Sequence, residues 1–537
     1  MQFASFDLAD PVFECFGRRF SFQVVTLENL YSLDPARTQQ GGSGDEWWLR
    51  AEGLTWAGGQ QRAAGGFEAR VQRAGAGRLR LSARASAPAE IRCVKWLVRD
   101  LDPDLVVLRS DGSEAPVGRF GELLEYPTRL PAPLVQLRAG AERLALRAED
   151  PRVRAKRCAL SVERLGPLAG RGVVEWIHEE DATRFGRTLE APDLWLASGA
   201  AAGAAEAEQL AFAERVLGLV PFEQRRDVPA WARGLRLVAT LHGMHFTGRV
   251  FLTYREMLGV LRFLAERLPG EAILAYLPGW EGRYYWQYGD YRPEPRLGGT
   301  ADFARLCDGA CALGVHLMPM FGANCANLRL PGLAATPSAA HLASATGNRF
   351  HGNQPDWDLA RAHDTGWQAW LNPGDAGWRA RLAEQIEAVL DAFGLDAVFL
   401  DTVHAWTNDP HAPVFDGVRA LVERLHAHTP GLLLAGEADY DALLGLFPLF
   451  QRPWWERPPA WTARYVRRFA HLCEGEPRGL TGVHEFGVWG PSLGSGRPRA
   501  SAAPSDAGLL PTLAFQDGTL EQCRAAIERT LAEISQR

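Results

Sequence analysis

The chain has 537 residues, of which 47% are hydrophobic and 23% are charged, the balance of a globular protein with two or more domains. Its formal net charge of -6 argues against nucleic acid as the main partner, because phosphate binding needs a basic face. No run approaches about 18 apolar residues, so neither a membrane span nor a membrane partner is expected. The first residues lack the pattern of a signal peptide, and the eight cysteines are scattered without a CxxC pair. We therefore expect a cytoplasmic protein with reduced thiols.

The first 205 residues contain many short strand-like runs. In residues 66–74 and 77–85 hydrophobic and polar side chains alternate, and glycine, proline, aspartate and serine separate successive runs. Many short alternating strands at this spacing are typical of a sandwich. We predict an antiparallel β-sandwich domain over residues 1–205. Residues 206–230 are alanine-rich at their start and are predicted to be a linker that enters a helix.

From residue 231 onward, apolar strands alternate with amphipathic helices. The strand-like run 395–403, for example, precedes the helix-like run 417–428. This alternation predicts a parallel sheet covered by helices. About eight such units can be counted, and eight units close into a (β/α)₈ TIM barrel, which we predict over residues 231–537. A doubly wound open sheet is the alternative, but no GxGxxG follows the first strand.

Two segments of the predicted barrel depart from the simple alternation. The sixth unit, around residues 461–475, is less clear than the others, and residues 479–487 are counted as the seventh strand. Residues from about 328 to 370 have little periodicity and are too long for an ordinary connection, so they are predicted to form an insertion over the barrel mouth.

Polar side chains stand where the predicted barrel strands end. In a barrel of this kind the active site lies at the carboxyl ends of the strands. The strand ends supply His242 and His245, Trp280 and Glu281, Asn324, Asp401 and His404, Glu437 and Asp439, His484 and Glu485, and Asp517.

Asp401 and Glu437 are the strongest pair among these residues. Each follows a buried-strand pattern, "AVFL" and "LLLAG", and the two are one βα repeat apart. Adjacent strands lie about 4.8 Å apart, so the two carboxylates could reach the roughly 5–5.5 Å separation of a retaining glycosidase. An isolated carboxylate would more often be a helix cap or an ion-pair partner, but two on neighbouring strands favour catalysis.

The loops predicted at the barrel mouth are rich in aromatic residues. Flat aromatic side chains with polar neighbours suit the C–H faces of sugar rings. The candidate substrate-binding residues are Trp280, Tyr285, Trp286, Trp406 and Trp455, together with His242, Asn324, His404 and His484.

The last third or so of the chain resembles the (β/α)₈ glycoside hydrolases of the α-amylase type. "GLDAVFLD" (394–401) is similar to the family's strand-four motif, "LLLAGEAD" (432–439) to its strand-five motif and "GVHEFG" (482–487) to its strand-seven motif. The resemblance implies that Asp401 is the nucleophile and Glu437 the acid/base. An N-terminal sandwich is common among such enzymes. Phe399 stands where the family has arginine.

These features together predict a retaining glycoside hydrolase that cleaves an O-glycosidic bond in a carbohydrate substrate, with α as the bond that the resemblance implies. His404 and His484 would donate hydrogen bonds to sugar hydroxyls, and Glu485 would stabilise the oxocarbenium ion. No cofactor and no metal are expected. In a second assignment Glu437 and Glu485 form the acid/base and nucleophile pair, with Asp401 as a helper.

Two other classes of function stay open at this point. A metal-dependent barrel hydrolase could use His242, His245, Glu437, His484 and Asp517, since these residue types chelate Zn²⁺. A non-catalytic carbohydrate-binding barrel is the other, because Phe399 replaces the family's arginine before Asp401.

Overall fold

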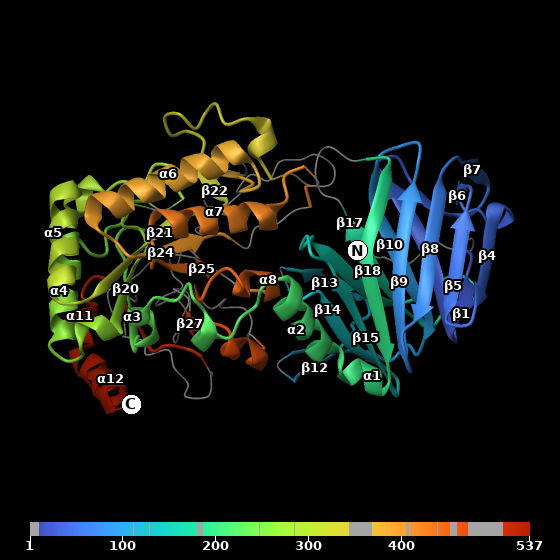
Figure 1. The fold of residues 1–537 in the computed structure, drawn as a ribbon, viewed down its shortest axis with the longest axis horizontal. Coiled ribbons are helices and arrows are strands. Elements are labelled where there is room, and N and C mark those ends of the chain that lie inside the picture. Colours follow the sequence, from blue (N-terminus) through green and yellow to red (C-terminus); the bar gives the residue numbers. More distant parts are fainter. Residues whose placement is uncertain are drawn as a thin grey trace.

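The computed structural model of the protein describes residues 10–110, 112–127, 129–179, 186–245, 248–283, 285–342, 368–403, 408–409, 411–437, 439–451, 459–470 and 508–536. These residues form two bodies that lie side by side, an all-β part and a part that mixes strands with helices (Figure 1). None of the helices among them is long and apolar enough to cross a membrane.

The first body is a sandwich of two antiparallel sheets. One sheet has the order β13-β16-β17-β10-β2-β3-β6-β7, with β1 paired to β2. Its strands are β1 (Phe13–Cys15), β2 (Arg18–Thr26), β3 (Leu30–Leu33), β6 (Leu54–Trp56), β7 (Gln61–Ala63), β10 (Ile91–Leu101), β13 (Glu122–Tyr126), β16 (Lys156–Val162) and β17 (Gly172–Glu179).

The second sheet has the order β12-β11-β14-β15-β18-β9-β8-β5-β4. Its strands are β4 (Thr38–Ser43), β5 (Glu46–Ala51), β8 (Gly66–Arg73), β9 (Arg78–Ser86), β11 (Leu105–Leu108), β12 (Glu114–Pro116), β14 (Leu134–Ala139), β15 (Glu142–Glu149) and β18 (Thr188–Ser198). Alternate residues of β5, β8 and β9 are buried, as their sequence pattern predicts. Between the sheets, Phe22 packs against Phe67 and Trp96 with ring centroids 5.0 and 4.7 Å apart. The predicted sandwich is confirmed.

The second body is a parallel barrel of eight strands in the order β27-β26-β25-β24-β21-β20-β19-β28. Its strands are β19 (Leu237–Leu241), β20 (Ile273–Leu277), β21 (His316–Gly322), β24 (Ala397–Asp401), β25 (Leu433–Glu437), β26 (Leu449–Gln451), β27 (Arg467–Phe469) and β28 (Thr512–Phe515). A parallel bridge between Arg468 and Leu509 joins the two ends of the sheet and almost closes the ring. The predicted barrel is therefore confirmed.

The helices pack outside the barrel strands (Figure 1). They are α3 (Ala230–Arg233), α4 (Tyr254–Ala265), α5 (Gly299–Ala312), α6 (Ala376–Phe393), α7 (Val414–His428), α8 (Asp441–Leu444), α11 (Thr519–Gln522) and α12 (Arg524–Gln536). Short 3-10 helices are η1 (Pro35–Arg37), η2 (Phe222–Gln224), η3 (Gly270–Ala272), η4 (Pro295–Leu297), η5 (Ser338–Ala340) and η6 (Ala460–Arg464), and β22 (Cys325–Asn327) pairs with β23 (Gln368–Trp370). Local sequence sets the helix ends: Thr253 and Glu256 form a capping box before α4.

The residues that form the sixth and seventh barrel strands differ from the predicted ones. The sixth strand is β26, and the seventh is β27, which lies inside the 461–475 segment that was predicted as the sixth unit. The predicted seventh strand, 479–487, lies outside the described residues. Strands of three residues are too short to show a period in the sequence, which explains why β26 and β27 were not recognised.

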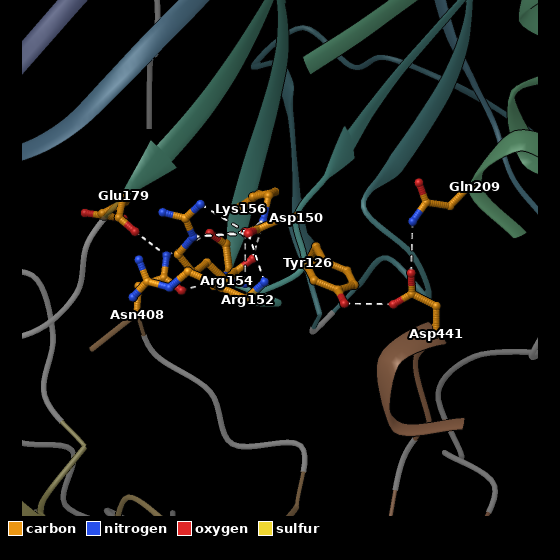
Figure 2. Close-up of polar contacts among 10 residues, drawn as sticks. Tyr126, Asp150, Arg152, Arg154, Lys156, Glu179, Gln209, Asn408 and Asp441 are labelled. Carbon is orange, nitrogen blue, oxygen red and sulfur yellow. Dashed lines mark hydrogen bonds and ion pairs between the residues drawn. The ribbon is translucent and has the colours of Figure 1, made fainter. Parts of the chain in front are cut away.

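The sandwich is attached to the carboxyl side of the barrel. Asn408, which follows β24, exchanges hydrogen bonds with the backbone of Ala155 in the sandwich (2.5 and 2.9 Å). Asp441, at the start of α8, accepts a hydrogen bond from the Tyr126 hydroxyl at 2.7 Å. Gln209 also donates to Asp441, at 3.1 Å (Figure 2). It lies on α2 (Ala205–Val216), which follows α1 (Ala200–Gly203) and runs between the sandwich and the barrel (Figure 1). The sandwich therefore contacts the segments that follow β24 and β25.

Candidate active site

Asp401 and Glu437 lie next to each other at the carboxyl edge of the barrel. Asp401 is the last residue of β24, and Glu437 is the last residue of β25. The strands pair in parallel with Leu400 beside Gly436, so the next position along each strand places the two carboxylates side by side. Asp401 is buried and Glu437 is half-buried. Two buried strands therefore hold both carboxylates at the barrel mouth.

Tyr288 is the hydrogen-bond donor to Asp401. Its hydroxyl donates to Asp401 Oδ2 at 2.5 Å, and the tyrosine is fully buried in the loop that follows β20. Burial and the nearby Asp401 carboxylate raise the pKa of Tyr288 well above its usual value, so the phenol keeps its proton. A protonated phenol beside a carboxylate orients that carboxylate and stabilises its negative charge.

Thr402 connects the ends of three barrel strands. Its backbone N–H donates to Glu437 Oε2 at 3.0 Å, and its hydroxyl accepts from the backbone N–H of Asn324 at 3.1 Å. Thr402 has φ of 64°, in the left-handed region that β-branched residues rarely adopt. Backbone strain of this kind is concentrated at functional sites, where neighbouring contacts hold it in place. Here it turns the N–H directly after Asp401 toward Glu437.

Glu281 is a buried acid near Tyr288 and Tyr291. It lies beyond the carboxyl end of β20 and is 2% exposed, and neither carboxylate oxygen has a hydrogen-bond partner among the residues that the structure describes, apart from its own backbone. Burial, with a smaller contribution from Glu294, raises the pKa of Glu281 to about 8. Its charge would also raise the pKa of Tyr288 and Tyr291. Glu281 is therefore mostly protonated at neutral pH.

The predicted aromatic substrate-binding residues that the structure describes differ in burial. Trp280 is fully buried, donates from Nε1 to the Met320 carbonyl at 2.9 Å, and stacks on Phe303 at 5.0 Å. A residue so placed packs the core, so the prediction that Trp280 contacts substrate is not supported. Tyr285 and Trp286 are half-buried in the loop after β20. The Trp286 ring lies 4.4 Å from the Arg283 guanidinium.

The remaining predicted binding residues divide into two groups. His242 and Asn324 are described, are 2% and 0% exposed, and lie at the ends of β19 and β21. The His242 ring packs against Phe251 in a T-shaped arrangement with ring centroids 4.7 Å apart. The backbone N–H of Asn324 donates to the Thr402 hydroxyl. The predicted residues that lie outside the described part of the chain are His404, Trp406, Trp455, His484 and Glu485.

The metal hypothesis receives no support from the described part of the chain. Within these ranges, no group of three or more histidine, cysteine, aspartate or glutamate side chains could hold a metal ion. Asp517, one of the proposed ligands, forms an ion pair with Arg249 at 2.6 Å.

Sequence reasoning missed two residues that contact the carboxylate pair. Tyr288 was visible only as one of several aromatics in a loop, and its contact with Asp401 spans 113 residues. Thr402 follows Asp401 directly, but its positive φ leaves no mark in the sequence. Glu281 was identified as a strand-end residue, whereas its complete burial depends on the packing of the loops above it.

Comparisons with known proteins give a fold relationship. No protein-family model and no curated protein matches the sequence. The solved structure of α-N-acetylgalactosaminidase NagBb from Bifidobacterium bifidum with GalNAc is similar, with a TM-score of 0.63, 14% identity, and coverage of 97% of this chain and 89% of that chain. The ligand-free form of the same enzyme matches with a TM-score of 0.60, 14% identity, and coverage of 97% and 90%. The GH36 α-galactosidase AgaA from Geobacillus stearothermophilus matches with a TM-score of 0.49, 13% identity, and coverage of 96% and 75%.

At these identities the likeness to NagBb shows the fold alone. That fold is an N-terminal sandwich followed by a barrel, as predicted. The expected resemblance to the α-amylase type is therefore correct only in the coarser sense of a barrel fold that a glycoside hydrolase adopts, because NagBb is described as an α-N-acetylgalactosaminidase.

Proposed function

We propose that this chain is a retaining α-glycoside hydrolase in which Asp401 is the nucleophile and Glu437 is the acid/base. The observation that carries the proposal is the placement of these two carboxylates on neighbouring strand ends, with Leu400 paired to Gly436 directly before them. Neighbouring strands about 4.8 Å apart suit the carboxyl separation of about 5–5.5 Å that a retaining mechanism needs.

The reaction proceeds in two steps. Asp401 attacks the anomeric carbon while the bond from that carbon to the glycosidic oxygen breaks, and Glu437 gives its proton to the leaving oxygen. In the second step Glu437 takes a proton from water, and the resulting hydroxide displaces Asp401 from the anomeric carbon. The released sugar has the same anomeric configuration as the substrate, and the enzyme returns to its starting state. Water is the only co-reactant that is consumed.

The contacts around Asp401 suit the role of nucleophile. The Tyr288 hydroxyl donates to Oδ2, which stabilises the ionised form and fixes the plane of the carboxylate. Phe399 fills the barrel interior two residues earlier and packs against Tyr276 and Phe469, with ring centroids 4.8 and 6.0 Å away. Phe399 stands where the α-amylase type has arginine, and we infer that Tyr288 supplies a polar contact to Asp401 that the apolar Phe399 cannot make.

The α preference and the first substrates to try rest on the neighbour in fold. NagBb is described as an α-N-acetylgalactosaminidase and was solved with GalNAc. We propose aryl α-N-acetylgalactosaminide and aryl α-galactoside as the first substrates for this chain. Among the described residues, the half-buried Tyr285 and Trp286 are aromatic side chains that could contact a sugar face.

The test compares Asp401→Asn, Glu437→Gln and Asp396→Asn on a panel of aryl glycosides. Asp396 is a matched control, because it directly precedes β24 at the opposite end of the strand and pairs with His316 at 2.7 Å. We expect Asp401→Asn to lose at least about 10³-fold in kcat and Glu437→Gln to lose about 10²–10⁴-fold on substrates with poor leaving groups. Asp396→Asn should turn over normally.

Two results would contradict the assignment. If Asp401→Asn keeps the turnover of the parent, Asp401 is not the nucleophile, and trapping with a fluorosugar would show whether another carboxylate is labelled. If the parent binds oligosaccharides but cleaves no linkage in the panel, the chain is a carbohydrate-binding barrel. NMR of the first-formed sugar, which should keep the configuration of the substrate, tests the retaining mechanism.

A further inference from the structure

A cavity of about 430 Å³ lies between the sandwich and the barrel. Its walls come from three places: the sandwich, with Arg109 and Ser110; α2, with Gln209; and the segments that follow β25 and β26, with Asp439 and Trp461. Asp401 and Glu437 are not among the lining residues. The volume is within the range of about 300–1,000 Å³ that small-molecule sites occupy.

Two side chains that line the cavity each have one buried acceptor atom without a hydrogen-bond partner among the described residues. These atoms are Oδ1 of Asp439 and Oε1 of Gln209. The other oxygen of Asp439 binds the Arg468 guanidinium, with both side chains 3% exposed, and the Gln209 amide nitrogen donates to Asp441. Buried acceptors without a donor are costly, so an occupant of this cavity should bring hydrogen-bond donors.

The charges on the wall favour a neutral occupant. Arg109 and Arg129 lie on the sandwich side and oppose a cation, and Arg129 is paired with Glu122 at 3.8 Å. The acids that line the cavity oppose an anion; they are Glu122, Glu206, Asp439 and Asp441. The charge of Asp439 is already balanced by Arg468. The polar part of the wall therefore suits hydroxyl groups, which donate to carboxylate and amide oxygens and accept from guanidinium groups.

The rest of the wall is apolar. Trp461, Leu130, Leu134 and Leu210 line the cavity, and Trp461 is half-buried. An aromatic side chain beside polar acceptors presents a flat surface for C–H groups next to hydrogen-bonding partners for hydroxyls.

We propose that this interdomain cavity is a second saccharide-binding site, separate from the candidate catalytic pair. A neutral sugar ring would donate hydroxyl hydrogen bonds to Asp439 Oδ1 and Gln209 Oε1 and would place its C–H face on Trp461. The proposal does not depend on hydrolysis at Asp401, since it concerns binding at other residues.

The test is titration with free galactose, glucose and N-acetylgalactosamine, followed by calorimetry and saturation-transfer NMR. Ser110→Trp fills the cavity from an exposed wall position and leaves the Gln209 contacts in place. Gln209→Met keeps the length of the side chain and removes the acceptor. Ser113→Trp is the matched control, because Ser113 is exposed on the same segment and does not line the cavity.

We expect one saccharide site to disappear in Ser110→Trp, to weaken about tenfold in Gln209→Met, and to persist in both Ser113→Trp and Asp401→Asn. Absence of saturable binding of all three sugars, or binding that neither cavity variant changes, would overturn the proposal. Aryl glycoside hydrolysis is measured in parallel. If the parent hydrolyses no aryl glycoside but sugar binding is lost in Ser110→Trp, only the proposed enzyme activity is contradicted. If the parent hydrolyses a glycoside but sugar binding is unchanged in Ser110→Trp, only the cavity site is contradicted.

Discussion

At the scale of single residues, the candidate site combines carboxylates that the sequence reveals with partners that it does not. Asp401 and Glu437 were predictable because each ends a continuous apolar run, and strand ends are where a barrel gathers reactive groups. Tyr288 was not predictable as the donor to Asp401, because a loop brings it there from 113 residues away. A pattern in the sequence can place a residue on an element, but it cannot say which distant side chain the loop will deliver.

Glu281 makes the stability of the protein depend on pH. Its pKa is raised from 4.5 to about 8 by burial, so the folded state binds the proton more tightly than the unfolded state does. The contribution of protonated Glu281 to the free energy of unfolding is fully present below about pH 4.5, and it is lost as the pH rises through about 8. Each unit of pKa shift is equivalent to about 1.4 kcal/mol.

Glu281→Gln has the same shape and no charge, so it should remove this dependence. We expect it to match the parent at low pH and to be more stable by a few kcal/mol above about pH 8, measured by urea unfolding across the pH range. Glu266→Gln is the control, since the Glu266 side chain is 71% exposed. Parallel stability curves for Glu281→Gln and the parent would contradict the prediction.

At the scale of elements, the long strands and helices were predictable and the short ones were not. The strands β19, β20, β21, β24 and β25 were each recognised from a continuous apolar run, whereas β26 and β27 have three residues each. The sequence of 461–475 predicts one strand-and-helix unit. The segment instead contains η6 and then β27, because Pro459 starts a short 3-10 turn that ends at Arg464.

A buried ion pair attaches β27 to the segment beyond β25. Arg468 donates to Asp439, and both side chains are 3% exposed. Arg468→Met would leave the Asp439 carboxylate buried without its partner, which should destabilise the protein by about 3–5 kcal/mol. Adding Asp439→Asn should recover part of that loss, because the unpaired charge is then removed as well.

The neighbouring residue provides the control for this prediction. Arg467 pairs with Glu223, whose side chain is 70% exposed, so Arg467→Met should cost no more than about 1 kcal/mol. Both variants are compared by chemical denaturation. If Arg468→Met is no less stable than Arg467→Met, the pair does not hold β27 in place.

At the scale of the whole molecule, the order of sandwich and barrel was predictable, but their contact was not. The change of hydrophobic period near residue 231 separates the two bodies in the sequence. Their attachment depends on contacts such as that of Tyr126 with Asp441, which are 315 residues apart. No local pattern predicts that a tyrosine at the end of a sandwich strand will meet an aspartate after the fifth barrel strand.

Asp441 makes this attachment sensitive to pH. Burial raises its pKa from 3.8 to about 6, although the hydrogen bonds from Tyr126 and Gln209 lower it (Figure 2). Because the folded-state pKa is the higher one, the stabilisation is fully present below about pH 3.8 and is lost as the pH rises through about 6. The opposing hydrogen bonds keep this dependence smaller than that of Glu281.

Asp441→Asn should remove the Asp441 contribution while a rotated Gln209 amide still supplies a hydrogen bond. We expect the difference in unfolding free energy between variant and parent to change by about 3 kcal/mol from pH 3.8 to above pH 6, in favour of the variant at the higher pH. Asp391→Asn is the control, because Asp391 is 68% exposed and lies on a helix away from the sandwich. If the difference in unfolding free energy between variant and parent stays constant over this interval, Asp441 has the same pKa in the folded and unfolded chains. In that case the contact between sandwich and barrel does not bury the charge of Asp441.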